Sequence, residues 1–575
     1  MYYGILLSTT ALASFPLQKL IFSPTVTPRL RLGLGLKLRP RLRSFKPQSS
    51  LAMASNERGE LKRRSVAGSF LFKVPDGDEN HPQVALFRRS GKVSTYQHKL
   101  APISGSVEKY DASPMATALR EINEETGLTL SSIELLRVGK PYTFIDQTIG
   151  REWTINPFAF RLKSKAEGGK GEEGITIDWE HEGFEWFNPL DVNESDEFGG
   201  VPKLVNSLRR VWPEYDFGPR AGRILTSGLQ KLRDDHESGS RQLAQTAVST
   251  LKNLIAEMNS DVVDDAWWAK VRMAAWHLCK ARESMGAAVT TAIVKALDQV
   301  EAVFVQNLSP PEKILQMTEA IQTQLKQRES TTDRLRDTFV EYVRRNVIQD
   351  VNNPRKTISV LTLSFSSTIL ACLMRLATDL GVSLDLRILE SRPLCEGVTL
   401  ASKLIEGGNG NPNLTVTLYA DASVAFAADD IDILVLGADR ISSEGDVNNK
   451  VGSLPAVLSQ RHVAPRAKVI VVSETEKVAS PGLKEQHPAE ENNPAELTKT
   501  WTGNVKGANV IQSALSNIES GSTHGHVRVR NTYFEWVPAG FIDVYVTEEG
   551  LWSIGDITTR SNWVGNEADR FFRDL

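Results

Sequence analysis

The first third of the chain has a strand-like pattern of hydrophobic residues. Short β-branched and aromatic runs are separated by Gly, Pro, Asp and Asn, and they extend from "RRSVAGSFLF" and "QVALFRRS" to "YTFID" and "INPFAFRL". One helical stretch lies between these runs. The pattern predicts an α+β domain at residues 60–205. Inside this domain, the polar segment "KSKAEGGKGEEG" is predicted to be a flexible loop.

A helical period replaces the strand pattern in the middle of the chain. In "RQLAQTAVSTLKNLIAE" the residues Leu243, Ala247, Leu251 and Leu254 recur at steps of four and three. Further helices are indicated by "AWWAKVRMAAWHLCKA", "GAAVTTAIVKALDQVEAVFV" and "EKILQMTEAIQTQLKQ". The sequence therefore predicts a helical domain at residues 220–350.

From residue 355 onward, apolar runs alternate with helical stretches. The runs include "TISVLTL", "LDLRILE", "LTVTLYA", "IDILVLGAD" and "AKVIVVSE". Strands this uniformly apolar are typical of a parallel sheet covered on both faces, so residues 355–575 are predicted to form a doubly wound, Rossmann-like α/β domain. The segment "PGLKEQHPAEENNPAEL" is rich in Pro and acid and is predicted to be a loop. The whole chain is thus expected to be multidomain.

Composition excludes some function classes. The 67 basic and 70 acidic residues nearly cancel, so no footprint for direct nucleic-acid binding is expected. The three cysteines, Cys279, Cys372 and Cys395, have no zinc or disulfide spacing, which indicates a reducing compartment. A run of eighteen apolar residues is absent from the sequence, which argues against a membrane span.

The N-terminal extension at residues 1–59 is basic. Its first 56 residues hold eight Lys or Arg and no acidic residue. Such a composition is typical of a mitochondrial transit peptide. The alternative is a non-authentic start, with translation beginning at Met53. We accordingly expect a cytoplasmic protein, or a mitochondrial one if the extension is genuine.

One helix within the α+β domain has clear start and stop signals. Ser113 and Pro114 provide an N-cap and a first-turn proline, and Gly127 suits a left-handed C-terminal residue. These signals predict a helix at residues 114–126. Its apolar stripe, which should face the core, comprises Met115, Ala118, Leu119 and Ile122.

Three acidic residues share another face of this predicted helix. Glu121, Glu124 and Glu125 are spaced i, i+3, i+4, so their side chains should converge. Like charges at this spacing repel by about 0.2–0.5 kcal/mol per pair. A bound Mg²⁺ or Mn²⁺, which prefers oxygen ligands, would reverse that cost. A solvated acidic face is the alternative that spacing alone leaves open.

The order of residues around this helix resembles the signature of the Nudix hydrolases. That signature is a Gly, five residues, Glu, seven residues, then Arg-Glu-aliphatic-x-Glu-Glu-x-Gly-aliphatic. The stretch from Arg120 to Leu128 matches its second half at every defined position. The first half departs from it: Gly105 is followed after five residues by Asp111 rather than Glu, and eight residues rather than seven separate Asp111 from Arg120.

The Nudix resemblance implies metal-dependent hydrolysis. Glu121, Glu124 and Glu125 would hold Mg²⁺ or Mn²⁺, with one of them or a partner acting as general base, and Arg120 would orient them. A metal-activated water would attack a diphosphate linked to another moiety. The family often adds a further Glu from a loop, for which "DWEHEGFEWF" offers the metal-ligand candidate Glu180, with Glu182 as the other choice.

A second set of candidates lies at the strand ends of the C-terminal domain. In open parallel sheets, ligands sit at the carboxyl ends of the strands. Three such ends carry polar residues, in "LSFSST", "ESRPLCEG" and "GADRISSEGDVNNKVGS". Ser366, just before a predicted helix, and Arg392 would suit a phosphate at a helix N-terminus.

Together, "ESRP", "GADRI", "GDVNNKVGS" and "NTYFEWVPAGFIDVYVTEEG" resemble a second family. It comprises the alpha, beta and delta subunits of the translation initiation guanine-nucleotide exchange factor, together with methylthioribose-1-phosphate and ribose-1,5-bisphosphate isomerases. The isomerases of this family use a Cys after the first strand of the sheet and the Asp of the Gly-Ala-Asp-Arg turn, which is Asp439 in this chain. The Cys position is occupied by Ser364 or a close neighbour, which argues against isomerase activity. Asp439, Asn449 and Lys450 would bind a phosphorylated ligand, or they only brace the turn.

The most favoured function is hydrolysis of a nucleoside diphosphate derivative, a nucleotide or nucleotide sugar, with Mg²⁺ or Mn²⁺. The C-terminal domain would bind a sugar phosphate or assemble subunits. One alternative is a non-enzymatic regulatory subunit of translation initiation, and another is a sugar-phosphate isomerase. The second resemblance implies a homodimer through the C-terminal domain and initiation-factor subunits as partners.

Overall fold

The computed structural model describes residues 61–575 except 75–81, 236–237, 259–260, 350–355, 380, 409, 485–486, 488–490, 502–504 and 520–526. The predicted N-terminal extension at residues 1–59 lies outside the described residues. Within the described part, none of the helices is both long and apolar enough to cross a membrane.

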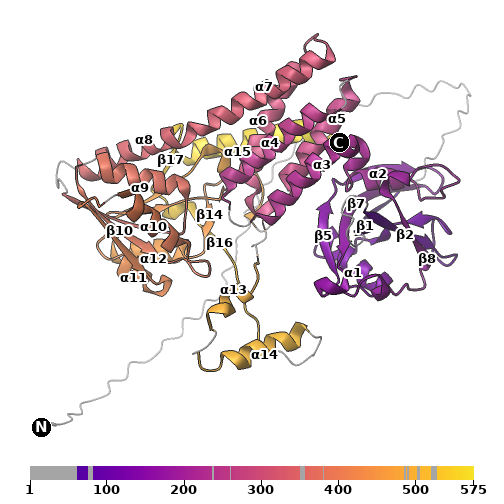
Figure 1. Cartoon of the computed structure of the whole chain (residues 1–575), viewed down its shortest axis with the longest axis horizontal. Coiled ribbons are helices and arrows are strands. Elements are labelled where there is room, and N and C mark those ends of the chain that lie inside the picture. The colour runs from indigo at the N-terminus through magenta and orange to yellow at the C-terminus, as the bar shows by residue number, and fades with distance from the viewer. Residues whose placement is uncertain are drawn as a thin grey trace, which may run out of the picture. The chain divides into compact units, whose positions relative to one another are not determined.

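Residues 62–209 form the predicted α+β domain around an eight-stranded mixed sheet (Figure 1). The central order is β3-β2-β1-β7-β5, while β4 pairs with β1, β6 with β7 and β8 with β2. Only the β1–β7 pair is parallel among these pairings. The strands are β1 (Lys62–Lys73), β2 (Gln83–Arg89), β3 (Leu100–Ala101), β4 (Ile103–Ser106), β5 (Ile133–Val138), β6 (Tyr142–Asp146), β7 (Arg151–Leu162) and β8 (His181–Phe187).

Alternation along the strands gives this sheet two apolar faces. On β1, Leu71 packs in the cluster that contains α1 (Pro114–Thr126), while Phe70 and Phe72 pack in the cluster that contains α2 (Leu204–Arg209). This is the period-two pattern expected of a strand buried on both sides. Each helix therefore covers its own face of the sheet.

The polar segment is a loop, as predicted, and it makes specific contacts with the sheet. It contains two short 3-10 turns, Lys165–Glu167 and Glu172–Gly174. Glu172 accepts hydrogen bonds from Lys73 Nζ at 2.7 Å and from Trp186 Nε1 at 2.8 Å. Charged side chains therefore tie the segment to β1 and β8.

The helical region consists of five long helices with one shared core. They are α3 (Glu214–Asp234), α4 (Ser240–Glu257), α5 (Asp265–Lys280), α6 (Gly286–Phe304) and α7 (Pro310–Glu329). Leu243, Ala247, Leu251 and Leu254 are all buried in it, as their spacing predicts. The core also includes Phe571 and Phe572 of the C-terminal helix α15 (Ile554–Phe572), which the periodicity of the middle segment alone does not reveal.

The C-terminal region contains a seven-stranded sheet of order β11-β10-β9-β12-β15-β17-β18, parallel except for the last pair. This is the predicted doubly wound arrangement. The chain winds outward from β9 in one direction and from β12 in the other, so the topological switch point lies between these two strands. The strands are β9 (Thr357–Leu363), β10 (Ser383–Leu389), β11 (Leu414–Tyr419), β12 (Ile433–Leu436), β15 (Lys468–Val472), β17 (Val544–Thr547) and β18 (Gly550–Trp552).

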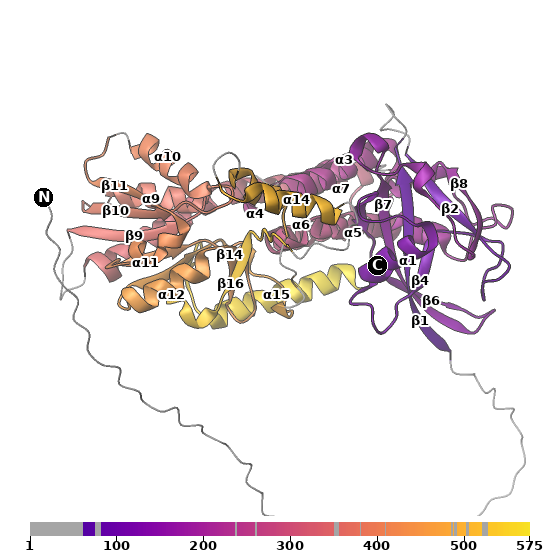
Figure 2. The same cartoon turned by 90° about the horizontal axis from the view of Figure 1, so that it is seen from below.

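Helices cover both faces of this sheet, and Figure 2 shows α9 and α10 on one side with α11 and α12 on the other. The helix α8 (Thr331–Val343) packs with the first of these layers, so it belongs to the sheet's core rather than to the five-helix core. The covering helices are α9 (Ser367–Asp379), α10 (Glu396–Gly408), α11 (Val424–Ala427) and α12 (Ser453–Val463).

A small antiparallel sheet of β13 (Arg440–Ile441), β14 (Val447–Lys450) and β16 (Phe534–Val537) extends the turn after β12. The acidic, Pro-rich segment is a loop where it is described, until α13 (Ala495–Thr498) begins at its end. The helix α14 (Ala508–Glu519) follows in the chain.

Candidate functional site

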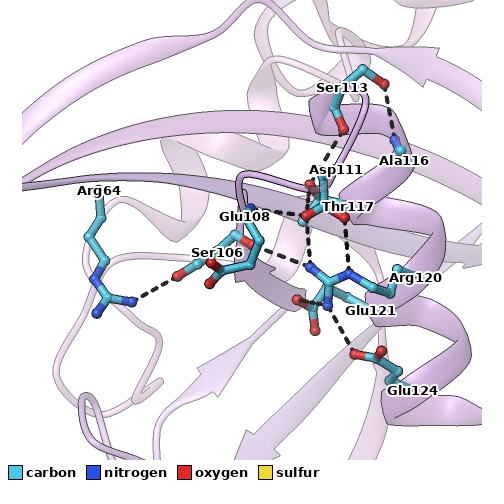
Figure 3. Close-up of polar contacts among 10 residues, drawn as sticks. All are labelled: Arg64, Ser106, Glu108, Asp111, Ser113, Ala116, Thr117, Arg120, Glu121 and Glu124. Atoms are coloured by element: carbon cyan, nitrogen blue, oxygen red, sulfur yellow. Dashed lines mark hydrogen bonds and ion pairs between the residues drawn. The ribbon is translucent and has the colours of Figure 1, made fainter.

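The helix α1 begins and ends where its capping residues predict. Ser113 is extended and its side chain accepts a hydrogen bond from the Ala116 amide at 3.2 Å (Figure 3). Pro114 occupies the first turn, and Gly127 adopts a left-handed φ of 67° that lets its amide reach the Asn123 carbonyl. The apolar stripe also packs as predicted: Ala118 and Ile122 are buried, and Met115 and Leu119 lie against the same cluster.

Arg120 lies at the centre of a network of carboxylates (Figure 3). Its guanidinium donates to Asp111 at 2.9 and 3.2 Å, to Glu121 at 2.7 Å and to Glu124 at 3.0 Å. Thr117 Oγ1 and the Glu108 amide donate to the same Asp111 carboxylate. Arg120 first, and then these donors, hold the pKa of Asp111 far below its usual range. This geometry suits an orienting role for Arg120.

Asp111, where the first half of the signature departs from the Nudix pattern, still binds Arg120. Asp111 is one methylene shorter than the family's Glu, and the loop that follows it is one residue longer. The carboxylate nevertheless reaches two nitrogens of Arg120. A longer loop therefore compensates for a shorter side chain.

Gly105, the first residue of the signature, leaves room for Glu121. A Cβ atom at position 105 would lie 1.8 Å from Glu121 Oε1. Because Gly105 lies on β4 and pairs with Ala67 of β1, its backbone cannot easily move away. The Glu121 carboxyl is thus packed against a strand, and burial raises its pKa.

Glu125 is turned into the protein interior. It is 2% exposed, and its Oε2 lies 2.5 Å from Nε2 of His181, which is also buried. Neither Oε1 of Glu125 nor Nδ1 of His181 has a hydrogen-bond partner among the described residues. Burial, and then the charges of Glu121, Glu180 and Asp178, raise the pKa of Glu125 well above its usual value. A solvated acidic face therefore does not describe Glu125.

The three glutamates, which their spacing predicts to converge, have different surroundings. Glu124 has a side chain that is 56% exposed and is held by Arg120, while Glu125 lies inside. Where the structure is described, no group of three His, Cys, Asp or Glu side chains is arranged to hold a metal ion. The residues nevertheless fit a divalent cation, because Glu125 Oε1 is buried without a partner and nearby carboxylates repel it.

Of the two downstream candidates, the structure brings Glu180 to this cluster and not Glu182. The charge of Glu180 acts on Glu121 and Glu125. The carboxylate of Glu182 instead lies 2.8 Å from His98 Nδ1. Sequence reasoning missed His181, which is the first residue of β8 and lies between Glu180 in the preceding turn and Glu182 on the strand. The opposite directions of successive strand side chains were the available signal.

In the C-terminal domain, two polar turns flank the topological switch point. Ser364 follows β9 in a left-handed conformation with φ of 64°, and its amide donates to Ser391 Oγ at 2.7 Å. Asp439 follows β12 and is part-buried, with its amide bonded to the Asn448 carbonyl. Ligands in open α/β sheets bind at such a point.

Two of the predicted ligand-binding residues, Asp439 and Lys450, lie close enough for their charges to interact. Burial raises the pKa of Asp439, and Lys477 and Lys450 oppose that rise. Lys450 Nζ lies 2.5 Å from Glu396 Oε1 and 4.2 Å from the centre of the Tyr533 ring. Lys477 was missed by the sequence reasoning because it lies in a 3-10 turn after β15 rather than in a motif.

The other three predicted residues are used in internal contacts. Ser366 Oγ accepts from the Ile369 amide at 3.3 Å and so caps α9. Arg392 Nη2 donates to Thr500 Oγ1 at 2.5 Å. Asn449 Nδ2 donates to Ser453 Oγ at 2.8 Å. These contacts give each residue a structural task beside any role with a ligand.

The cysteines occupy three different settings. Cys279 and Cys372 are buried, Cys395 is half-buried, and all three are free thiols. Burial raises the pKa of Cys279 to about 12 and raises that of Cys372 further. Cys372 is therefore a core residue.

Comparison with known proteins matches two regions of the chain to known sequence families. The sequence model of the initiation factor 2 subunit family matches residues 236–554, and that of the NUDIX domain matches residues 66–208. The chain is 28% identical over 198 residues to ribose 1,5-bisphosphate isomerase of Archaeoglobus fulgidus, which covers 33% of this chain and 53% of that protein. It is 30% identical over 183 residues to methylthioribose-1-phosphate isomerase of Pelotomaculum thermopropionicum, and the match covers 31% of this chain and 44% of that protein.

The chain thus spans about half the length of the curated relatives it matches. Both are isomerases, so the sequence-based argument against isomerase activity is not confirmed. Among solved structures, translation initiation factor eIF-2B of Pyrococcus horikoshii has 19% identity and a TM-score of 0.41 over 57% of this chain and 96% of that one. The chain belongs to the initiation factor 2 subunit family and carries a NUDIX domain in front of the family region.

Proposed function

We propose that the NUDIX domain hydrolyses a nucleoside diphosphate derivative with the help of Mg²⁺ or Mn²⁺. The observation that carries this proposal is the buried Glu125 carboxylate, whose Oε1 has no hydrogen-bond partner among the described residues. An unpartnered buried oxygen is costly and calls for a ligand. A divalent cation would supply one.

Four residues would hold the cation: Glu121, Glu124, Glu125 and Glu180. When bound, the cation supplies a water of lowered pKa and neutralises charge on the phosphoryl oxygens. One of these glutamates, or a neighbouring group, would act as the general base toward that water.

The remaining residues of the site would position these carboxylates. Arg120 fixes Glu121 and Glu124 through direct hydrogen bonds and is itself fixed by Asp111. His181 holds one oxygen of Glu125 and leaves the other unpartnered. Such supporting contacts restrict the ligands to one arrangement.

A screen of substrates separates this function from a regulatory role without hydrolysis. The full chain is incubated with nucleoside diphosphate sugars, dinucleotides and nucleotides, and the products are identified with Mg²⁺ present and after its removal by a chelator. We expect cleavage of a diphosphate bond only with the metal. If no compound is cleaved and the chain co-purifies with other initiation-factor subunits, the regulatory alternative is correct.

For the C-terminal domain, a second function is favoured by the position of Asp439 at the switch point, where the charges of Lys477 and Lys450 act on it. We propose that this region binds a sugar phosphate, since Lys450 and Lys477 would attract the phosphate and Asp439 could exchange a proton with the sugar. Isomerisation of ribose 1,5-bisphosphate or methylthioribose 1-phosphate is the corresponding activity. Turnover that is abolished by Asp439→Asn would support it, and binding without turnover would leave a sensing role.

A further inference from the structure

Two neighbouring arginines at the end of β2 have opposite surroundings. Arg88 forms an ion pair with Glu185 at 3.1 Å and donates to the His98 carbonyl. For Arg89, the structure gives one side-chain hydrogen bond, from Nε to the Thr95 carbonyl at 3.2 Å. Among the residues that the structure describes, no carboxylate lies within 4.0 Å of the Arg89 guanidinium, and its two terminal nitrogens have no acceptor.

The strand register places Arg89 on the side of the acidic cluster. Arg89 pairs with His181 of β8, and the register shifts between Arg88 and Arg89. Residues directly opposite in an antiparallel pair project to the same face of the sheet. Because His181 contacts Glu125, Arg89 projects toward the same carboxylates. Such a bulge commonly re-aims a side chain beside an active site.

The electrostatics agree with this placement. Burial first, and then the charges of Glu121, Glu180 and Asp178, raise the pKa of Glu125, and Arg89 is the cation that opposes this rise. Arg89 also lowers the pKa of His181, although burial lowers it more. The guanidinium is therefore near the cluster without being neutralised by it.

The backbone around Arg89 is fixed. Its amide donates to the Lys99 carbonyl at 3.0 Å, and its carbonyl accepts from the His98 amide at 2.9 Å. The next residue, Ser90, donates its amide to the Glu180 carbonyl at 2.7 Å. With Nε bound to Thr95, the guanidinium plane is held while both terminal nitrogens stay open. This is the form in which arginine binds two oxygens of one phosphate group.

We propose that Arg89 binds a phosphoryl group of the substrate, donating from both terminal nitrogens to two non-bridging oxygens. The carboxylates would face the cation and Arg89 would face the anion, so the site would select compounds with a diphosphate. This proposal rests on the proposed hydrolase function of the NUDIX domain.

The test compares equilibrium binding by the full chain and two matched variants. The probe is imidodiphosphate, whose P–N–P bridge resists hydrolysis, in the presence of Mg²⁺, measured by calorimetry. We expect Arg89→Gln to weaken binding at least about 10-fold, since charged bidentate hydrogen bonds are lost. Arg88→Gln should stay within about twofold of the wild type. Arg89→Lys should recover only part of the affinity.

Several results would overturn the role of Arg89. These are wild-type protein that does not bind the probe, Arg89→Gln that binds like the wild type, or equal weakening by both glutamine variants. Mn²⁺ affinity, measured by equilibrium dialysis, should be unchanged in Arg89→Gln, and its loss would show that Arg89 acts through the metal instead. If binding depends on Arg89 but no substrate is cleaved, the hydrolase proposal is wrong and the phosphate-binding role of Arg89 is supported. If substrate is cleaved and Arg89→Gln leaves its KM unchanged, the hydrolase proposal is supported and the role of Arg89 is wrong.

Discussion

Asp111 and Arg120 are joined by two hydrogen bonds, of 2.9 and 3.2 Å, across a loop that is one residue longer than the Nudix signature allows. The pair links the loop before α1 to the glutamates on it, because Arg120 also binds Glu121 and Glu124. The irregular half of the signature therefore performs a definite task in this chain.

Replacing Asp111 tests that task. We expect Asp111→Asn to lower the hydrolysis rate or the Mg²⁺ affinity about 10- to 100-fold, as is usual when the support of a metal ligand is removed. Glu108→Gln is the control, because Glu108 is exposed on the same loop. Steady-state rates over a range of Mg²⁺ concentrations measure both effects. Equal behaviour of the two variants would contradict the positioning role.

The contact between Gly105 and Glu121 predicts a steric effect. Gly105→Ala should displace the Glu121 carboxyl, because the new methyl would lie 1.8 Å from Oε1. We expect activity to fall at least about 10-fold, with a destabilisation of about 1–3 kcal/mol from overpacking. Gly183→Ala on β8 is a matched strand control, since its Cβ would meet nothing within 4 Å. A fully active Gly105→Ala variant would refute the contact.

His277, in the core of the five helices, predicts a dependence of stability on pH. Burial lowers its pKa to about 3, from 6.5 in the unfolded chain. The folded state therefore binds fewer protons, so the stabilisation is present above pH 6.5 and is lost as the pH falls toward 3. The full loss is on the order of 5 kcal/mol at most.

The comparison with His277→Gln isolates this contribution. The side chain of Gln does not titrate, so the difference in unfolding free energy between wild type and variant should shrink as the pH falls from 7 to 4. Urea unfolding followed by tryptophan fluorescence measures this difference, because the ring centres of Trp276 and His277 lie 5.1 Å apart. A difference that is constant with pH would show that His277 is not buried neutral.

The Lys450–Glu396 pair predicts a coupled effect on stability. Lys450 is 5% exposed, and the second oxygen of Glu396 is buried without a partner among the described residues. Lys450→Met should destabilise the fold by about 3 kcal/mol, because it leaves a carboxylate unpaired. Adding Glu396→Gln should recover part of that loss. Additive effects in this double-mutant cycle would show that the two groups do not interact.

Local signals made α1 predictable. Its caps, its first-turn proline and its apolar stripe all lie within fifteen residues, and the helix has the expected bounds. The parallel sheet was predictable for a similar reason, since strands buried on both faces consist almost entirely of apolar residues. These features depend on neighbours in the sequence.

Contacts between distant segments could not be predicted in the same way. His181 reaches Glu125 only because β8 pairs with β2 in one register, and the shift at Arg89 sets that register. The helix α15 joins the five-helix core from the far end of the chain. The contacts of Glu172 with Lys73 on β1 and Trp186 on β8 likewise join segments far apart in the sequence.

The most direct test of the central claim is the hydrolysis rate of Glu125→Gln compared with that of Glu182→Gln, using the substrate found in the screen and saturating Mg²⁺. Both changes replace one carboxyl group with an amide, but only Glu125 belongs to the proposed metal site. The account predicts a fall of at least about 100-fold for Glu125→Gln and a wild-type rate for Glu182→Gln. Undiminished hydrolysis by Glu125→Gln would contradict it.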